Sequence, residues 1–205
     1  MFTLTADNLG KRFGERKVFA DISFQLTTGN SLAVTGPNGS GKSTLVMLLL
    51  GYYHPTRGEV HFKEEDRSLP ESRIRSRTSL VSPYLNLYDH LTGEENLTFF
   101  STVAGGHVTG KRIDELLRMV GLEGRGVDMV GAYSSGMKQR LKYALALLNE
   151  PDFLFLDEPT SNLDERGKGI VAEIIEEYRQ RAIVVVATNE EEELSFASQL
   201  CRLGQ

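Results

Sequence analysis

A glycine-rich segment at residues 36–44, GPNGSGKST, has the composition and spacing of a loop that binds phosphate groups. Its glycines let the backbone curl so that N–H groups point at phosphate oxygens, and the positive end of the following helix strengthens that field. The Lys42 ammonium can reach the terminal phosphates, and the Ser43 hydroxyl can ligate Mg²⁺. A chance glycine-rich turn is the alternative. Because the segment lies between an expected strand and an expected helix, we predict a nucleotide site made of Gly36, Pro37, Asn38, Gly39, Ser40, Gly41, Lys42, Ser43 and Thr44.

Two adjacent carboxylates, Asp157 and Glu158, follow the apolar segment FLFL. We expect Asp157 to hold Mg²⁺, usually through water, and Glu158 to polarise a water molecule aimed at the γ-phosphate. A general base of this kind contributes about 10²–10⁴ in rate. Acidic residues are also common where a strand leaves a core. The phosphate-binding segment favours the catalytic interpretation.

The segment IVVVATNEEEE at residues 183–193 reads as a strand buried on both faces, followed by a small polar pair and four glutamates. Thr188 and Glu191 have the spacing of a capping box. We therefore expect a helix to begin here, with the glutamates as favourable negative charge in its first turn.

Strand-like and helix-like segments alternate at both ends of the chain, whereas residues 93–149 have helical periodicity. This alternation predicts an α/β fold with a parallel sheet, preceded by short strands at 2–9 and 18–26. The polar stretch that contains Arg67, Arg73, Arg75 and Arg77 is expected to be a solvated loop.

The composition is that of an ordinary globular protein, with 205 residues, 40% hydrophobic and 25% charged. The net charge of -5 argues against a general nucleic-acid binder. The single cysteine, Cys201, fits a reducing compartment. No apolar run is long enough to span a bilayer, and the N-terminus lacks signal-peptide features. We expect a soluble cytoplasmic protein for which any membrane role needs a partner.

Two further segments narrow the class: YSSGMKQR at 133–140 opens a helix, and SNLD at 161–164 follows the carboxylates. With the phosphate-binding segment and the carboxylate pair, in this order, the chain resembles the ATP-binding subunit of an ABC transporter over nearly its whole length. The resemblance implies one domain, 1–205, in which a P-loop NTPase core has an N-terminal antiparallel β subdomain and an inserted α-helical subdomain at about 83–150. It also implies ATP and Mg²⁺ as cofactors.

Members of that family hold two ATP molecules between two head-to-tail subunits. The resemblance therefore implies contacts to the partner's nucleotide from Ser134, Ser135, Gly136 and Asp164. Serine and glycine at a helix N-terminus offer a hydroxyl and free N–H groups to an anion. Ser134 as a simple N-cap is the alternative. The sequence departs from the family's Leu-Ser-Gly-Gly-Gln, because Ser135 adds a side chain and Met137 removes an amide.

Three other positions follow from the same resemblance. Phe13 stands where an aromatic ring stacks on adenine, although a phenylalanine at a sheet edge or in the core is the alternative. The family's metal-contacting glutamine is absent, since Pro83 and Ser82 occupy that place, and Ser82 could contact the metal through water. Asn189 replaces the switch histidine near the γ-phosphate. Asparagine can still donate a hydrogen bond but cannot carry the imidazole's charge.

The resemblance implies two partners, a transmembrane permease subunit and a second ATP-binding subunit in a homodimer. In keeping with the net charge of -5, we expect no nucleic-acid partner. The resemblance also places the protein on the inner face of the cell membrane, where ATP binding and hydrolysis drive export. In size and layout the chain is similar to the ATP-binding subunit of the heme exporter used in cytochrome c maturation. An exporter of a drug, lipid or polysaccharide, and a regulatory subunit that hydrolyses ATP weakly, are the alternatives.

Overall fold

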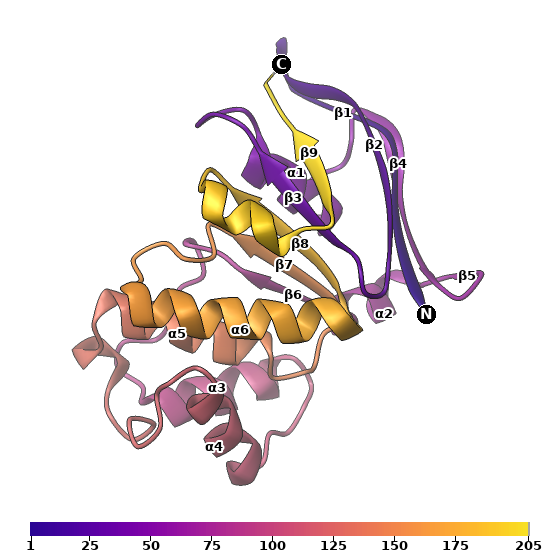
Figure 1. Cartoon of the computed structure of the whole chain (residues 1–205). Helices are drawn as coiled ribbons and strands as arrows, with labels where there is room; N and C mark the ends of the chain where they lie inside the picture. Colours follow the sequence, from indigo (N-terminus) through magenta and orange to yellow (C-terminus); the bar gives the residue numbers. More distant parts are fainter. Residues whose placement is uncertain (205) are drawn as a thin grey trace.

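A parallel five-stranded sheet forms the centre of the structure, a computed structural model that describes residues 1–204 (Figure 1). The strand order is β6-β7-β8-β3-β9, and every paired neighbour is parallel. The strands are β3 (Ser31–Thr35), β6 (Thr78–Val81), β7 (Phe153–Asp157), β8 (Ile183–Thr188) and β9 (Gln199–Arg202). The predicted parallel core is confirmed.

Strands β7 and β8 are buried along their whole length. Leu154 and Val184 belong to the core shared with helices α3 (Gly93–Val103), α4 (Gly110–Met119), α5 (Ser135–Ala146) and α6 (Glu165–Arg181). Phe155 and Val185 belong to the core on the other face. A parallel strand covered on both faces needs apolar side chains at every position, which explains the continuous apolar runs in the sequence. The expectation that β8 is buried on both faces is confirmed.

A second, antiparallel sheet packs beside the parallel one and has the order β2-β1-β4-β5. Its strands are β1 (Phe2–Phe13), β2 (Arg16–Thr27), β4 (Arg57–Glu64) and β5 (Arg67–Ser68). Strands β1 and β2 run past their expected bounds because they form one long hairpin that turns at Gly14, with a φ of 56°. The hairpin end therefore carries Phe13. The N-terminal antiparallel part of the predicted fold is confirmed.

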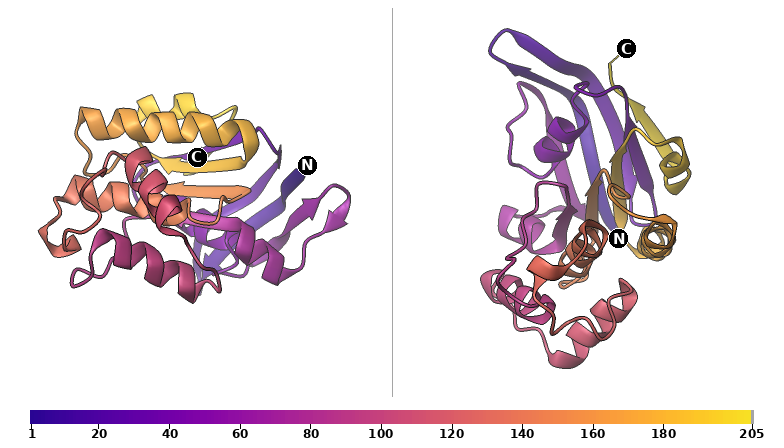
Figure 2. Two further views of the ribbon diagram at one scale, coloured as in Figure 1. Left: turned by 90° about the horizontal axis from the view of Figure 1, so that it is seen from below. Right: turned by 90° about the vertical axis from the view of Figure 1, so that its left-hand side faces the viewer.

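The helices lie around the two sheets, and α3 and α4 lie far from the antiparallel sheet (Figures 1 and 2). In Figures 1 and 2, α3 and α4 lie on the opposite side of the parallel sheet from the antiparallel sheet. Helices α3, α4 and α5 all come between β6 and β7 in the chain. No helix within residues 1–204 is long and apolar enough to cross a bilayer. The helices are α1 (Lys42–Leu49), α2 (Glu71–Arg77), α3 (Gly93–Val103), α4 (Gly110–Met119), α5 (Ser135–Ala146) and α6 (Glu165–Arg181), with 3-10 turns η1 (Val130–Ala132) and η2 (Glu191–Phe196).

Arg73, Arg75 and Arg77 lie on a helix, α2, and Arg67 lies on β5, so the expectation of a loop there is wrong. Arg77 at the end of α2 forms a half-buried ion pair of 2.5 Å with Asp152, just before β7. Arg73 pairs with Glu64 at 2.9 Å. The run of arginines in the sequence does not reveal the partner of Arg77, because Asp152 lies 75 residues further along the chain.

The capping box predicted from Thr188 and Glu191 is also wrong. The Thr188 hydroxyl accepts a hydrogen bond from the Glu190 N–H at 2.9 Å, one residue too early for a box, and the short 3-10 turn η2 begins at Glu191. Glu193 is buried, so it is not a solvated charge that starts a helix. Strand β9, which follows η2, was absent from the sequence-based expectations because its residues are mostly exposed.

Candidate nucleotide site

The phosphate-binding segment links the end of β3 to the start of α1, as its sequence predicts. A side chain at Gly36, where φ is 147°, would put its Cβ 2.4 Å from the Leu203 carbonyl oxygen. At Gly41, where φ is 101°, a Cβ would lie 2.4 Å from Val18 Cγ1. Both positions thus require glycine. The curled backbone between them leaves Asn38 and Gly39 exposed, next to the free N–H groups of α1.

Lys42 lies folded into this loop. Its side chain is 7% exposed, and Nζ donates to the carbonyl oxygens of Gly36 at 2.9 Å and Pro37 at 3.3 Å. Burial lowers the pKa of Lys42, and the charges of Glu158 and Asp157 oppose that shift. An ammonium held at the centre of the loop by two carbonyls is well placed to turn toward a bound phosphate.

Asp157 and Glu158 stand at the end of β7. Asp157 is 1% exposed, and its Oδ1 has no hydrogen-bond partner among the described residues. Burial raises the pKa of Asp157, while the adjacent Ser43 hydroxyl opposes the rise. A buried carboxylate with an open oxygen beside a serine hydroxyl fits Mg²⁺, which prefers oxygen ligands. Glu158 adopts a φ of 52°, and its exposed carboxylate leaves the line of the strand.

A cavity of about 400 Å³ opens in front of the loop. Phe13 is 47% exposed at this cavity, so it is not a core residue. Its ring meets Tyr53 edge-to-face at 5.5 Å, and Lys11 Nζ lies 4.7 Å from the ring centroid. Tyr84, which follows the place of the absent glutamine, lines this cavity although it was not predicted to do so. Arg16 and Val18, which follow the hairpin turn after Phe13, also line the cavity and were not predicted to do so. The lining residues are Phe13, Arg16, Val18, Asn38, Gly39, Gly41, Lys42, Ser43, Thr44, Tyr84 and Glu158.

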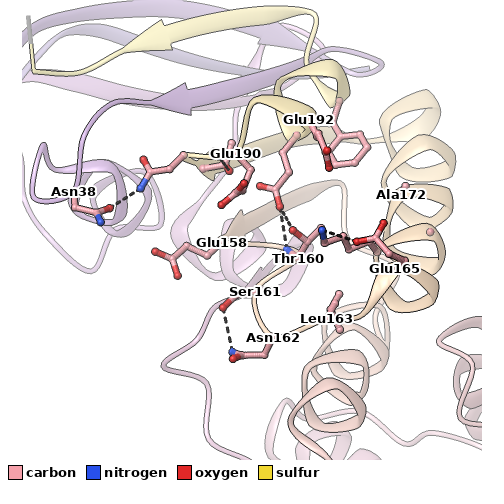
Figure 3. A pocket seen from close by; sticks show the side chains of 16 residues that line it. Asn38, Glu158, Thr160, Ser161, Asn162, Leu163, Glu165, Ala172, Glu190 and Glu192 are labelled. Atoms are coloured by element: carbon pink, nitrogen blue, oxygen red, sulfur yellow. Dashed lines mark hydrogen bonds and ion pairs between the residues drawn. The ribbon is translucent and has the colours of Figure 1, made fainter.

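A second cavity of about 650 Å³ adjoins the first and shares Asn38 and Glu158 with it. Figure 3 shows these two residues on one side of the cavity and Glu165 and Ala172 on the other. Asn189 lines the same space, and its side-chain amide donates to Asn38 Oδ1. Asn189 therefore lies at the phosphate-binding loop.

Ser82 does not line either cavity. It is 1% exposed, and its hydroxyl accepts from the Tyr84 N–H at 3.2 Å. The Lys142 Nζ donates to the carbonyl oxygens of Ser82 at 3.1 Å and Pro83 at 3.0 Å. Lys142 thus ties this loop to helix α5, and the residue that the loop presents to the cavity around Lys42 is Tyr84.

The residues expected to contact a partner's nucleotide lie outside the cavity around Lys42. Ser134 caps α5, accepting from the Met137 N–H at 3.2 Å, and Ser135 beside it is exposed. Asp164 caps α6 and accepts from the Gly167 N–H at 2.8 Å. A Cβ on Gly136 would lie 3.3 Å from the Asn162 carbonyl oxygen, so the two motif segments are neighbours.

This arrangement defines the class of the protein. A glycine loop that opens onto a helix N-terminus, and an Asp–Glu pair two strands away in the same parallel sheet, make a P-loop NTPase. Residues 19–161 match the family model described as ABC transporter. The chain belongs to this family and is an ABC-type ATPase domain.

Several curated proteins are similar over most of the chain. Nod factor export ATP-binding protein I of Burkholderia orbicola is 34% identical over 198 residues, covering 95% of this chain and 65% of that protein. Linearmycin resistance ATP-binding protein LnrL of Bacillus subtilis is 32% identical over 206 residues, covering 98% and 65%. Daunorubicin resistance ATP-binding protein DrrA3 of Streptomyces coeruleorubidus is 36% identical over 170 residues, covering 82% and 54%. The chain thus spans less than two thirds of the length of these relatives.

Solved structures show the same fold. An ATP-binding subunit of an ABC transporter superposes with a TM-score of 0.84 and 26% identity, covering 98% of this chain and 85% of that one. A dimeric ATP-binding cassette in a post-hydrolysis state, bound to ADP and Pi, gives a TM-score of 0.83 and 26% identity, with coverage of 98% and 94%. The fold class predicted from the sequence is confirmed.

Proposed function

We propose that the chain hydrolyses ATP as one half of a nucleotide-bound pair and thereby drives export through a separate membrane protein. The observation that carries this proposal is the position of Glu158, which borders both the cavity around Lys42 and the adjoining cavity that contains Asn189. A carboxylate at that junction lies between the phosphate-binding loop and open space from which water can enter.

The residues of the site divide the work of phosphoryl transfer, which consists mostly of positioning and charge neutralisation. The loop N–H groups and Lys42 bind the terminal phosphates, and Phe13 stacks on the adenine. Ser43 and Asp157 hold Mg²⁺, which neutralises phosphate charge when bound. Glu158 orients and polarises the attacking water, and Asn189 donates a hydrogen bond toward the γ-phosphate.

Pairing of two copies explains the residues that lie away from the chain's own cavity. Ser134, Ser135, Gly136 and Asp164 surround two helix N-termini, which are favourable places for a phosphate. In a head-to-tail pair they complete the partner's site. ATP then favours the closed pair and hydrolysis favours separation, because the nucleotide binds the two states with different affinity. A permease that contacts both copies follows this movement.

Export is favoured as the direction of transport by the relatives, whose names refer to Nod factor export and to linearmycin and daunorubicin resistance. None of these three names refers to heme, so heme export for cytochrome c maturation has no specific support. We therefore favour an exporter for another substrate. The permease places the chain at the inner membrane face.

A weakly hydrolysing regulatory subunit is the second candidate. Two observations favour it: Asn189 cannot carry the charge of an imidazole, and the Ser82 hydroxyl is already engaged by the Tyr84 N–H.

The test is phosphate release by the chain in complex with the membrane protein that co-purifies with it from its host, reconstituted in lipid vesicles. Wild type should release phosphate at least ~100-fold faster than Glu158→Gln, as expected when a general base is lost. It should also drive ATP-dependent movement of a tracer drug such as daunorubicin, which Glu158→Gln should not. Equal, slow phosphate release by both forms would favour the regulatory subunit and contradict the exporter.

A further inference from the structure

Glu158 begins a tight turn that is held by hydrogen bonds to β8, α5 and η2. Its carbonyl oxygen accepts from the Ser161 N–H at 3.2 Å, and Pro159 occupies the second position, which defines a β-turn. Its own N–H donates to the Ala187 carbonyl oxygen in β8 at 2.9 Å. With a φ of 52° at Glu158, the direction of its side chain depends on the geometry of this turn.

The central peptide unit of the turn, between Pro159 and Thr160, is held at both ends. Its carbonyl oxygen accepts from Tyr143 Oη at 2.9 Å and from Gln139 Nε2 at 3.4 Å. Its N–H donates to Glu193 Oε1 at 3.2 Å, and the Thr160 hydroxyl donates to the same oxygen. Figure 3 shows Thr160 with its dashed contacts at the wall of the larger cavity.

This peptide unit is the one whose orientation distinguishes the common turn types, because a flip reverses its C=O and N–H directions. A flip here would break the bonds from α5 on one side and the bonds to Glu193 on the other. Tyr143, Gln139 and Glu193 are 0%, 4% and 3% exposed, so water cannot readily replace them. These hydrogen bonds on both sides of the peptide unit therefore fix one turn geometry.

Stability alone does not account for a buried carboxylate at this place. Glu193 Oε2 has no hydrogen-bond partner among the described residues, and a buried polar oxygen without a partner lowers stability. The phenol opposite is a dependable donor, because burial raises the pKa of Tyr143 well above its usual value and the charge of Glu193 raises it further.

We propose that Glu193 and Tyr143 are positioning residues for hydrolysis, which hold the Pro159–Thr160 peptide unit and through it set the direction of Glu158. The inference rests on the proposed role of Glu158 as the residue that polarises water. It also links two other parts of the site. Tyr143 lies on the helix that Ser134 caps, and Glu193 lies on the segment that starts with Asn189.

The experiment compares steady-state kinetics, ATP affinity and thermal unfolding of Tyr143→Phe, Glu193→Ala and Glu193→Gln, measured in the complex with its membrane protein. Tyr143→Phe and Glu193→Ala should lower kcat about 10-fold to 100-fold, with KM and ATP affinity within about twofold of wild type, because they alter the direction of Glu158 and leave the phosphate-binding loop unchanged. Glu193→Gln keeps an acceptor for Thr160 and should recover most of the loss. Glu192→Ala, at the exposed neighbouring position, is the matched control and should have wild-type kcat.

Coupling to Glu158 is the decisive readout. In a Glu158→Gln background, Tyr143→Phe should cause no further loss in single-turnover hydrolysis, because the group that it positions is already gone. An independent further loss, or wild-type kcat in both Tyr143→Phe and Glu193→Ala while Glu158→Gln is slow, would overturn this inference alone. Wild-type turnover by Glu158→Gln would overturn the proposed role of Glu158 and this inference with it.

Discussion

The side-chain amide of Asn189, at the end of β8, donates a hydrogen bond to Oδ1 of Asn38 in the phosphate-binding loop. The two residues are far apart in sequence but border the same cavity. The end of β8 is therefore in direct contact with the loop that binds phosphate.

Asn189→Ala should reduce steady-state phosphate release about fivefold, because a neutral hydrogen bond contributes roughly 1 kcal/mol. Asn189→His should equal or exceed wild type, since an imidazole can donate the same bond and also carry charge. Unchanged rates in both variants would limit Asn189 to a structural contact with Asn38.

Lys42→Ala should weaken ATP binding at least ~100-fold in a calorimetric titration, because charge-assisted hydrogen bonds to phosphate contribute about 1.5–3 kcal/mol each. Lys168→Ala is the control: Lys168 borders the adjoining cavity but pairs with Glu165 at 2.9 Å. Its ATP affinity should equal that of wild type. Retained affinity in Lys42→Ala would refute the assignment of the loop.

Lys142→Met should loosen the loop that presents Tyr84 to the cavity. It removes the hydrogen bonds to the carbonyl oxygens of Ser82 and Pro83, and we expect the free energy of unfolding to fall by about 1–2 kcal/mol. Amide exchange at Tyr84 should accelerate. Lys138→Met, on the same helix, removes only a surface pair with Asp89 and should change stability by less than ~1 kcal/mol. Equal effects of the two variants would contradict a role for Lys142 in holding the loop.

The stability of the protein should respond differently to loss of the hydroxyl at two buried tyrosines. Tyr143→Phe removes the bond to the Pro159 carbonyl oxygen and should lower the free energy of unfolding by about 1–3 kcal/mol. Tyr178 Oη has no partner among the described residues, so Tyr178→Phe should be neutral or stabilising. Urea denaturation at neutral pH measures both.

The same tyrosines predict a dependence on alkaline pH. Burial raises the pKa of Tyr143 and of Tyr178 above the usual tyrosine value. The folded protein thus keeps protons that the unfolded chain releases near pH ~10. Their contribution to stability is fully present below that pH and is lost as the pH rises further. Each Phe variant should lose stability less steeply above pH ~10 than wild type, and an identical slope would contradict the burial of the phenol.

The phosphate-binding loop and the buried strands were predictable because their signals are local. Gly36 and Gly41 have conformations that the motif itself requires, and β8 is apolar at every position because both faces are covered. The position of the hairpin end, by contrast, could not be predicted from a local signal. It depends on the pairing of β1 with β2, which places Phe13 at the cavity.

Contacts between residues that are far apart in the chain could not be predicted from the sequence. The four glutamates after Asn189 look alike in the chain, but only Glu193 among them is buried and bonded to Thr160. The segment therefore folds as a 3-10 turn around that contact, and not as a capped α-helix. The position of Tyr84 was not predicted either, because the loop that carries it is held by Lys142 from helix α5.

The central claim is that two copies close around ATP. Sedimentation velocity on Glu158→Gln tests it most directly, because slow hydrolysis should preserve the ATP-bound state. We predict a monomer without nucleotide and a dimer with ATP and Mg²⁺, and a monomer under both conditions when Lys42→Ala is added. A Glu158→Gln protein that binds ATP yet remains wholly monomeric would contradict the account.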